Sequence, residues 1–184
     1  MQDAKNLEFR IRRLEDRSQI DELIARYCFA MDNRDVDEFP NIFARNVVIR
    51  SADGVMNSEG LEAATDMFRA RFKVLGPSNH VTHDRIVQFD ANDSDRATGI
   101  VSSHAEMNRL GKSMLAAMRY ADVYQRIADR WLFKQRLLSF FYYVPTTEYV
   151  DCLQQGLSSR MRAYEEPRPA DWPEQLPTWK RYYD

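Results

Sequence analysis

The second half of this chain is dominated by long segments of strand character joined by very short turns. The expected turns between these segments are a polar cluster from Asp90 to Asp95, Gly111-Lys112 and Asp129-Arg130. The segments are His80 to Phe89, Arg96 to Leu110, Ser113 to Ile127 and Trp131 to about Tyr143. Consecutive strands with short connections pair antiparallel, whereas parallel neighbours need a long crossover. The pattern therefore predicts an antiparallel meander.

The first half of the chain has helical periodicity. Apolar residues recur at spacings of three and four, and they are Ile20, Leu23, Ile24, Tyr27 and Met31. This spacing predicts a helix that Ser18 caps and that runs to about Asn33. A separate stripe of Leu7, Ile11 and Leu14 is expected to form an arm or extra turn that packs on a neighbour.

Two more helices are expected before the meander. One runs from Val36 to Phe43, with Pro40 making it irregular, and the other runs from Glu59 to Phe72. Between them, Val47 to Met56 reads as a hairpin turning at Asp53-Gly54. Three helices followed by a curved sheet place the chain in the α+β class.

The chain changes character after Pro145. Residues 152–164 are expected to form a short helix. The last segment, residues 166–184, is rich in proline and aromatic residues, which are Pro167, Pro169, Trp172, Pro173, Pro177, Trp179, Tyr182 and Tyr183. Disordered tails contain few aromatic residues, so this segment is expected to be an ordered strap on this subunit or on a partner. We therefore predict one domain over residues 1–150 and an extension over 151–184.

Composition excludes several classes of function. The chain has 184 residues and a net charge of −2, which argues against a nucleic-acid binder that relies on bulk positive charge. Six glycines leave little room for a glycine-rich phosphate loop, and no nucleotide, flavin, haem or metal motif occurs. Cys28 and Cys152 lie far apart, which excludes a thiolate zinc site and favours two reduced thiols. With neither a secretory signal nor an apolar run long enough to span a bilayer, we expect a cytoplasmic protein that makes no membrane contact and carries no cofactor.

Candidate catalytic residues are few. Strand alternation places His80 and His83 on opposite faces of their strand, and a histidine under the helices would be half-buried, where it can act as a base. Asp32, at the end of the first long helix, is either a helix-terminal cap or the carboxylate that orients such a histidine. Taken alone, each strand histidine is more often a structural residue than a catalytic one.

Three short motifs, taken together, indicate a family resemblance. Residues 26–33 (RYCFAMDN), residues 79–82 (NHVT) and residues 130–133 (RWLF) occur here in this order. In text and spacing they resemble the SnoaL-like proteins of the nuclear transport factor two-like, cystatin-like cone superfamily. Dehydratases and a dehydrochlorinase of that superfamily are the members that this text resembles most. The resemblance implies a cone-shaped α+β barrel, with three N-terminal helices on a curved, mostly antiparallel sheet.

The resemblance also implies site residues. The helix-end aspartate of the dehydratases corresponds to Asp32, their meander histidine to His80, and their assisting tyrosine to Tyr27. A second pocket histidine corresponds to His104, and a basic pocket residue on a late strand corresponds to Arg136. Met118 and Phe133 are expected to line a substrate pocket of several hundred Å3. A homo-oligomer is implied, either a trimer or a dimer.

These residues favour an enzyme over a scaffold, because catalysis needs ionisable groups in the pocket. The expected function is a cofactor-independent lyase, of the dehydratase β-elimination type, or an isomerase that acts on a hydrophobic cyclic small molecule through an Asp–His dyad. Two alternatives stay open. One is a non-catalytic ligand-binding module of the same fold, and the other is the small subunit of a ring-hydroxylating dioxygenase.

Overall fold

The computed structural model describes residues 2–154 and 158–183, with residues 2, 3 and 5 described by their backbone alone. Its helices are α1 (Gln2–Asn33), α2 (Phe39–Ile42), α3 (Leu61–Phe72) and α4 (Pro177–Tyr183), with 3₁₀ turns at Val36–Glu38 and Thr146–Glu148. Its strands are β1 (Phe43–Ser51), β2 (Asn57–Glu59), β3 (Leu75–Phe89), β4 (Arg96–Arg109), β5 (Lys112–Ile127) and β6 (Arg130–Pro145). Among these described residues, no helix is long and apolar enough to cross a membrane.

The strands form one mixed sheet that does not close into a barrel, in the order β2-β1-β6-β5-β4-β3. The antiparallel pairs β3–β4, β4–β5 and β5–β6 confirm the predicted meander, while β1 pairs parallel with β6. Gly76-Pro77 lies inside β3, which therefore begins before His80. Proline is tolerated there because β3 is an edge strand.

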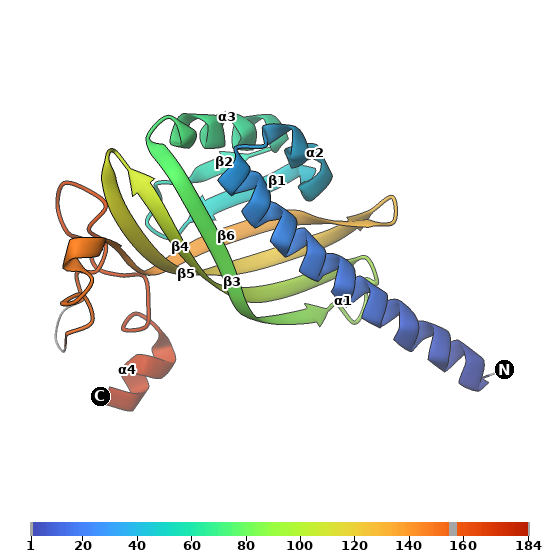
Figure 1. The fold of residues 1–184 in the computed structure, drawn as a ribbon. Coiled ribbons are helices and arrows are strands. Elements are labelled where there is room, and N and C mark those ends of the chain that lie inside the picture. Colours follow the sequence, from blue (N-terminus) through green and yellow to red (C-terminus); the bar gives the residue numbers. More distant parts are fainter. Residues whose placement is uncertain (1, 155–157, 184) are drawn as a thin grey trace.

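The helices cover one face of this curved sheet, as the α+β class requires (Figure 1). α1 runs across that face, and α2 and α3 lie beside its C-terminal end. The predicted break at Ser18 is wrong, since α1 is one continuous helix from Gln2 to Asn33. Its first turns project beyond the sheet, which leaves Phe9 and Leu14 more than half exposed.

An aromatic cluster forms the core beneath the helices. Tyr27 of α1 packs edge-to-face against Phe43 of β1 and Phe133 of β6, with ring centroids 6.1 and 5.9 Å apart. Phe39 of α2 and Phe68 of α3 complete it at 5.4 Å from each other. Edge-to-face rings add favourable electrostatics to the burial of their large apolar surface. This cluster fixes the C-terminal half of α1 against the sheet.

The C-terminal extension packs on β6. Met161 pairs with Tyr143 and Arg168, and Trp172 stacks on Phe141 with ring centroids 4.8 Å apart. The described residues of the segment 152–164 form turns and this bridge, so the helix predicted there is wrong; residues 155–157 lie outside the described residues. α4, which the sequence did not indicate, ends the described chain.

Candidate functional site

The end of α1 brings an aspartate to a histidine of β3. Oδ1 of Asp32 lies 2.6 Å from Nδ1 of His80, and Oδ2 accepts a hydrogen bond of 2.7 Å from the His80 backbone N–H. Both side chains are half-buried, at 15% and 16% exposure. One carboxylate therefore holds both the ring and the backbone of the histidine, which fixes the direction in which the ring points.

α1 ends here through the backbone conformation of Arg34. Its φ of 59° is left-handed, and the N–H groups of Arg34 and Asp35 donate to the carbonyls of Met31 and Ala30. This is the hydrogen-bond pattern of a helix C-terminus that glycine normally adopts. Because the helix stops at this point, the Asp32 side chain faces the first residues of β3.

Arg34 and Ser78 fasten the two elements together. Arg34 Nη1 donates to Ser78 Oγ at 3.0 Å, and its guanidinium also donates to the carbonyls of Met31 and Gly76. Ser78 Oγ in turn donates to Asp32 Oδ1 at 2.8 Å. The carboxylate of Asp32 thus accepts from three donors, counting the ring and backbone of His80.

These donors decide the ionisation of Asp32. Burial opposes its charged form, but the hydrogen bonds from His80 and Ser78 outweigh burial and lower the pKa of Asp32. An ionised carboxylate only accepts hydrogen bonds, so Nδ1 of His80 must carry the proton. In the neutral ring, Nε2 then has a free lone pair, and it has no partner among the described residues. That nitrogen is available as a base.

His80 borders a small apolar cavity of about 60 Å3. The lining includes aromatic rings from α1, α3, β5 and β6 and four of the eight methionines of the chain. It consists of Tyr27, Met31, Arg34, Met56, Phe68, Arg71, Phe72, Leu75, Ser78, His80, Met107, Met118, Tyr120, Leu138, Phe140 and Tyr143. The cavity is much smaller than the several hundred Å3 predicted, because these side chains fill most of the space between the helices and the sheet.

A buried ion pair lies behind this lining. Arg136 is fully buried, and its Nε and Nη2 donate to the two carboxylate oxygens of Asp122 at 2.8 and 2.7 Å. Its guanidinium carbon lies 4.1 and 4.2 Å from the ring centroids of Tyr27 and Tyr120. Its Nη1 has no hydrogen-bond partner in the described part of the chain. Burial raises the pKa of Tyr27 despite the opposing charge of Arg136, which keeps that hydroxyl protonated at neutral pH.

A SnoaL-like domain profile matches residues 12–137, which is more than half of the chain. The protein belongs to the SnoaL-like family. No curated protein matches it significantly.

Several solved structures share this fold. A hexachlorocyclohexane dehydrochlorinase, LinA type 3, from Novosphingobium barchaimii LL02 superposes with a TM-score of 0.66 at 21% identity, over 72% of this chain and 91% of that one. A scytalone dehydratase-like protein from Novosphingobium aromaticivorans DSM 12444 has a TM-score of 0.66 at 15% identity, over 72% and 89%. The β subunit assigned to an aromatic-ring-hydroxylating dioxygenase from the same organism has a TM-score of 0.56 at 17% identity, over 67% and 87%.

Within this SnoaL-like domain, four of the predicted residues meet at one place. Asp32 and His80 are in contact, and Tyr27 and His80 line the same cavity. Met118 also lines it. Phe133 and Arg136 do not: the first belongs to the aromatic core, and the second is shielded from the cavity by the tyrosine rings.

The predicted pocket role of His104 is wrong. Its Nδ1 lies 2.7 Å from Nε2 of His83, and neither histidine lines the cavity at His80. The strand register explains this: His80 stands opposite Ala105, and His104 stands opposite Val81. Directly paired residues point to the same side, so His104 shares the face of Val81 and not that of His80.

Three polar residues of this site were missed by the sequence reading, namely Arg34, Arg71 and Ser78. Ser78 had a signal, since it lies two residues before His80 and so shares its face of the strand. Arg34 had no such signal, because the sequence does not show that an arginine at a helix end adopts a left-handed backbone conformation. No group of three or more His, Cys, Asp or Glu residues suited to a metal ion occurs in the described ranges.

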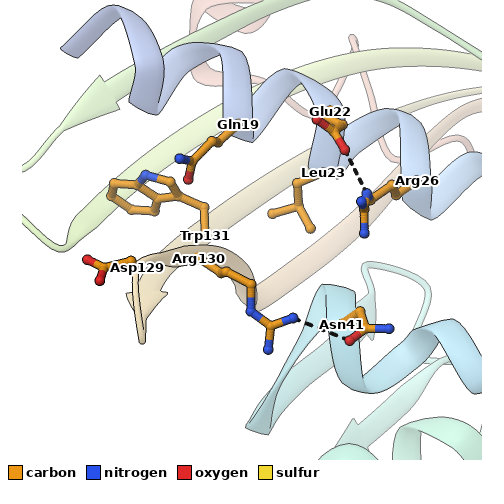
Figure 2. A pocket seen from close by; sticks show the side chains of 8 residues that line it. All are labelled: Gln19, Glu22, Leu23, Arg26, Asn41, Asp129, Arg130 and Trp131. Carbon is orange, nitrogen blue, oxygen red and sulfur yellow. Dashed lines mark hydrogen bonds and ion pairs between the residues drawn. The ribbon is translucent and has the colours of Figure 1, made fainter. Parts of the chain in front are cut away.

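A second hollow, of about 160 Å3, lies between α1, α2 and the turn from β5 to β6 (Figure 2). Glu22, Arg26 and Arg130 of its lining are engaged with neighbours. Arg26 Nε donates to Glu22 at 2.9 Å, and Arg130 donates to Asn41 at 3.3 Å. Because these groups satisfy one another, this hollow lacks the base and the apolar lining that distinguish the cavity at His80.

Proposed function

We propose that this SnoaL-like protein is a cofactor-independent lyase or isomerase that acts on a small hydrophobic cyclic molecule. His80 is the base that removes a proton from carbon, and Asp32 is the residue that positions it. The observation that carries this proposal is the contact of 2.6 Å between Asp32 Oδ1 and His80 Nδ1, beside an apolar cavity. It leaves Nε2 as the unshared basic nitrogen.

The same base serves either reaction. In β-elimination, the electron pair of the broken C–H bond forms the new double bond while the C–O bond breaks, and the departing hydroxide takes a proton and leaves as water. In isomerisation, that pair moves toward a carbonyl, and the proton returns at another carbon. When His80 becomes positively charged, the adjacent carboxylate of Asp32 stabilises the charge.

Tyr27 is the proton donor in this proposal. Its ring lines the cavity that His80 borders, and burial keeps its hydroxyl protonated. A protonated phenol donates a hydrogen bond to an oxygen that gains negative charge, which lowers the energy of that state. His104 has no part in this scheme, because it lies on the other face of the sheet.

The alternative is a non-catalytic module of the same fold. The small cavity and the likeness to a dioxygenase β subunit favour it. The two functions differ in one measurable respect. An enzyme of the proposed kind exchanges or removes a carbon-bound proton, whereas a scaffold subunit or a binding module leaves its ligand unchanged.

The test is turnover in D₂O with a panel of hydroxylated cyclic ketones and steroid-like alcohols. Mass spectrometry reads loss of water, and proton NMR reads deuterium entering the substrate or product. We expect turnover by the wild type, with His80→Ala and Asp32→Asn each slower by about 10²–10⁴-fold. His83→Ala is the matched control, because His83 lies outside the cavity and should leave the rate unchanged. Binding without turnover by the wild type would favour the alternative.

A further inference from the structure

The charged side chains that line the cavity beside His80 are positive. Arg34 and Arg71 line it beside the neutral ring of His80, and its described lining contains no aspartate or glutamate. The remaining lining side chains are apolar, aromatic or neutral, with Ser78 as the one small hydroxyl. Cationic groups set in an apolar wall attract an anion more strongly than they would in water.

The two arginines differ in what they already bind. The guanidinium of Arg34 donates to Ser78 Oγ and to the carbonyls of Met31, Leu75 and Gly76, and it stacks on Phe72 at 4.7 Å. Its donors are therefore used to join α1 to β3. Arg34 contributes charge to the cavity but has little capacity left to bind a ligand.

Arg71 has that capacity. It lies in the last turn of α3, is half-buried, and its side chain makes no hydrogen bond or ion pair with any described residue. A guanidinium offers five N–H donors in a planar fork that matches a carboxylate. A half-buried guanidinium with no protein partner keeps these donors available to a ligand that enters the cavity.

Asp53 lies within electrostatic range of Arg71, and it is already engaged. Burial opposes the charged form of Asp53, but its hydrogen bonds, together with the charge of Arg71, lower its pKa. Oδ1 of Asp53 accepts from the Ser51 hydroxyl and the Val55 N–H, and Oδ2 accepts from the Tyr164 hydroxyl. Asp53 therefore partly offsets the positive charge of Arg71 but accepts no hydrogen bond from its guanidinium.

We propose that Arg71 binds the carboxylate of the ligand, so that the substrates of this protein are hydrophobic carboxylic acids. The inference rests on the proposed function for the role of His80, and it adds the substrate class. In this arrangement the fork of Arg71 holds the carboxylate, which does not react. The apolar wall holds the hydrocarbon part, whose C–H bond faces Nε2 of His80.

The lining also bears on how such a ligand is accommodated. Met31, Met56, Met107 and Met118 are unbranched, flexible side chains that can change rotamer at low cost. A cavity of about 60 Å3 can therefore widen around a ligand larger than itself. Specificity then comes from the fixed charge of Arg71 rather than from a rigid shape.

The test compares acids with neutral isosteres. Isothermal titration calorimetry measures the dissociation constants of phenylacetate and phenylacetamide, and of butyrate and butyramide as a smaller pair. We expect the wild type to bind the acid of at least one pair about 10-fold more tightly than the amide, as charge-assisted hydrogen bonds allow. Arg71→Gln should abolish this preference, and Arg71→Lys should retain part of it. Arg69→Gln, on an exposed residue of the same helix, is the matched control and should change nothing.

The outcomes separate this proposal from the proposed function. Equal binding of acid and amide by the wild type in both pairs, or a preference that persists in Arg71→Gln, would overturn the role of Arg71. If Arg71→Gln does not fold, Arg71→Lys is the variant to measure. A preference for acid over amide as strong in Arg71→Lys as in the wild type would then overturn the role of Arg71. His80→Ala should keep the full preference, because it removes the base and not the carboxylate site. Absence of turnover in a panel extended to hydroxylated cyclic carboxylic acids would therefore defeat the enzyme while leaving the carboxylate preference readable.

Discussion

Nδ1 of His80 lies 2.6 Å from Oδ1 of Asp32, although 48 residues separate the two in the chain. The contact joins the last turn of α1 to β3, and the same carboxylate accepts from the Ser78 hydroxyl and from the backbone of His80. A carboxylate with this many donors does more than orient a ring. It also ties the end of a helix to the edge strand of the sheet.

Asp32 is expected to make folding stability depend on pH. Its pKa is lowered in the folded protein, so the unfolded chain binds more protons in acid, and stability rises with pH in that range. The contribution is present above about pH 4 and is lost as the pH falls through the folded pKa. Urea unfolding from pH 3 to 6 should show a shallower pH dependence for Asp32→Asn than for the wild type.

The matched control for that experiment is Asp37→Asn. Asp37 is exposed in the 3₁₀ turn that follows α1, with no side-chain hydrogen bond or ion pair in the described part of the molecule. It should leave the pH dependence of the wild type intact. If Asp32→Asn and the wild type lose stability in parallel on acidification, the hydrogen bonds at Asp32 do not have the assigned effect.

Arg34 is expected to have two separable effects on stability. Arg34→Ala removes the guanidinium and keeps the unfavourable left-handed backbone, whereas Arg34→Gly removes the guanidinium and relieves the backbone. Arg34→Ala should therefore be less stable than Arg34→Gly by about 1 kcal/mol. Chemical denaturation measures the difference, and equal stabilities would show that the φ of 59° stores no strain.

Replacement of one partner of the buried Arg136–Asp122 pair should be severe. Arg136→Met leaves the Asp122 carboxylate buried, with Tyr124 Oη at 2.9 Å as its one remaining side-chain partner among the described residues. Breaking a buried pair in this way costs about 3–5 kcal/mol. The double variant Arg136→Met/Asp122→Leu should recover much of that loss, because it leaves no isolated charge. A double variant no more stable than the single one would argue against this account.

The register of the sheet explains which site residues could be read from the sequence. Asp32 and His80 could be predicted as site residues. Asp32 lies at the end of a helix and His80 on a strand, both of which are visible as sequence patterns, and the family resemblance linked the two. His104 failed because the face on which a residue lies depends on its pairing across strands, and His104 pairs with Val81 while His80 pairs with Ala105. Alternation within one strand carries no information about that pairing.

The size of the cavity and the burial of Arg136 were also beyond the sequence. Both depend on how side chains from α1, α3, β5 and β6 fill a common space, which no local pattern specifies. Arg136 reads as an ordinary strand arginine until Asp122 is seen opposite it on β5. The continuous α1 was missed for a simpler reason: Ser18 is a good cap, but the residues before it are equally good helix formers.

The predicted homo-oligomer stays a prediction with a direct measurement. Ile86 and Ile100 stand opposite each other on β3 and β4 and are more than half exposed in the single chain. Light scattering should report a mass two or three times 21.7 kDa at micromolar concentration. A single-chain mass would contradict the expectation.

Tyr27→Phe should slow turnover less than His80→Ala does. The change deletes one hydroxyl and keeps the ring that packs against Phe43 and Phe133, so the fold should survive it. Without that donor, the oxygen that gains charge loses one hydrogen bond, which typically slows an enzyme by about 10²–10³-fold at most. Loss of the base removes the proton-transfer step itself. With a substrate from the D₂O panel, kcat should fall and KM should change little, since apolar contacts supply most of the binding. A Tyr27→Phe variant as fast as the wild type would leave the base in place and remove Tyr27 from the mechanism.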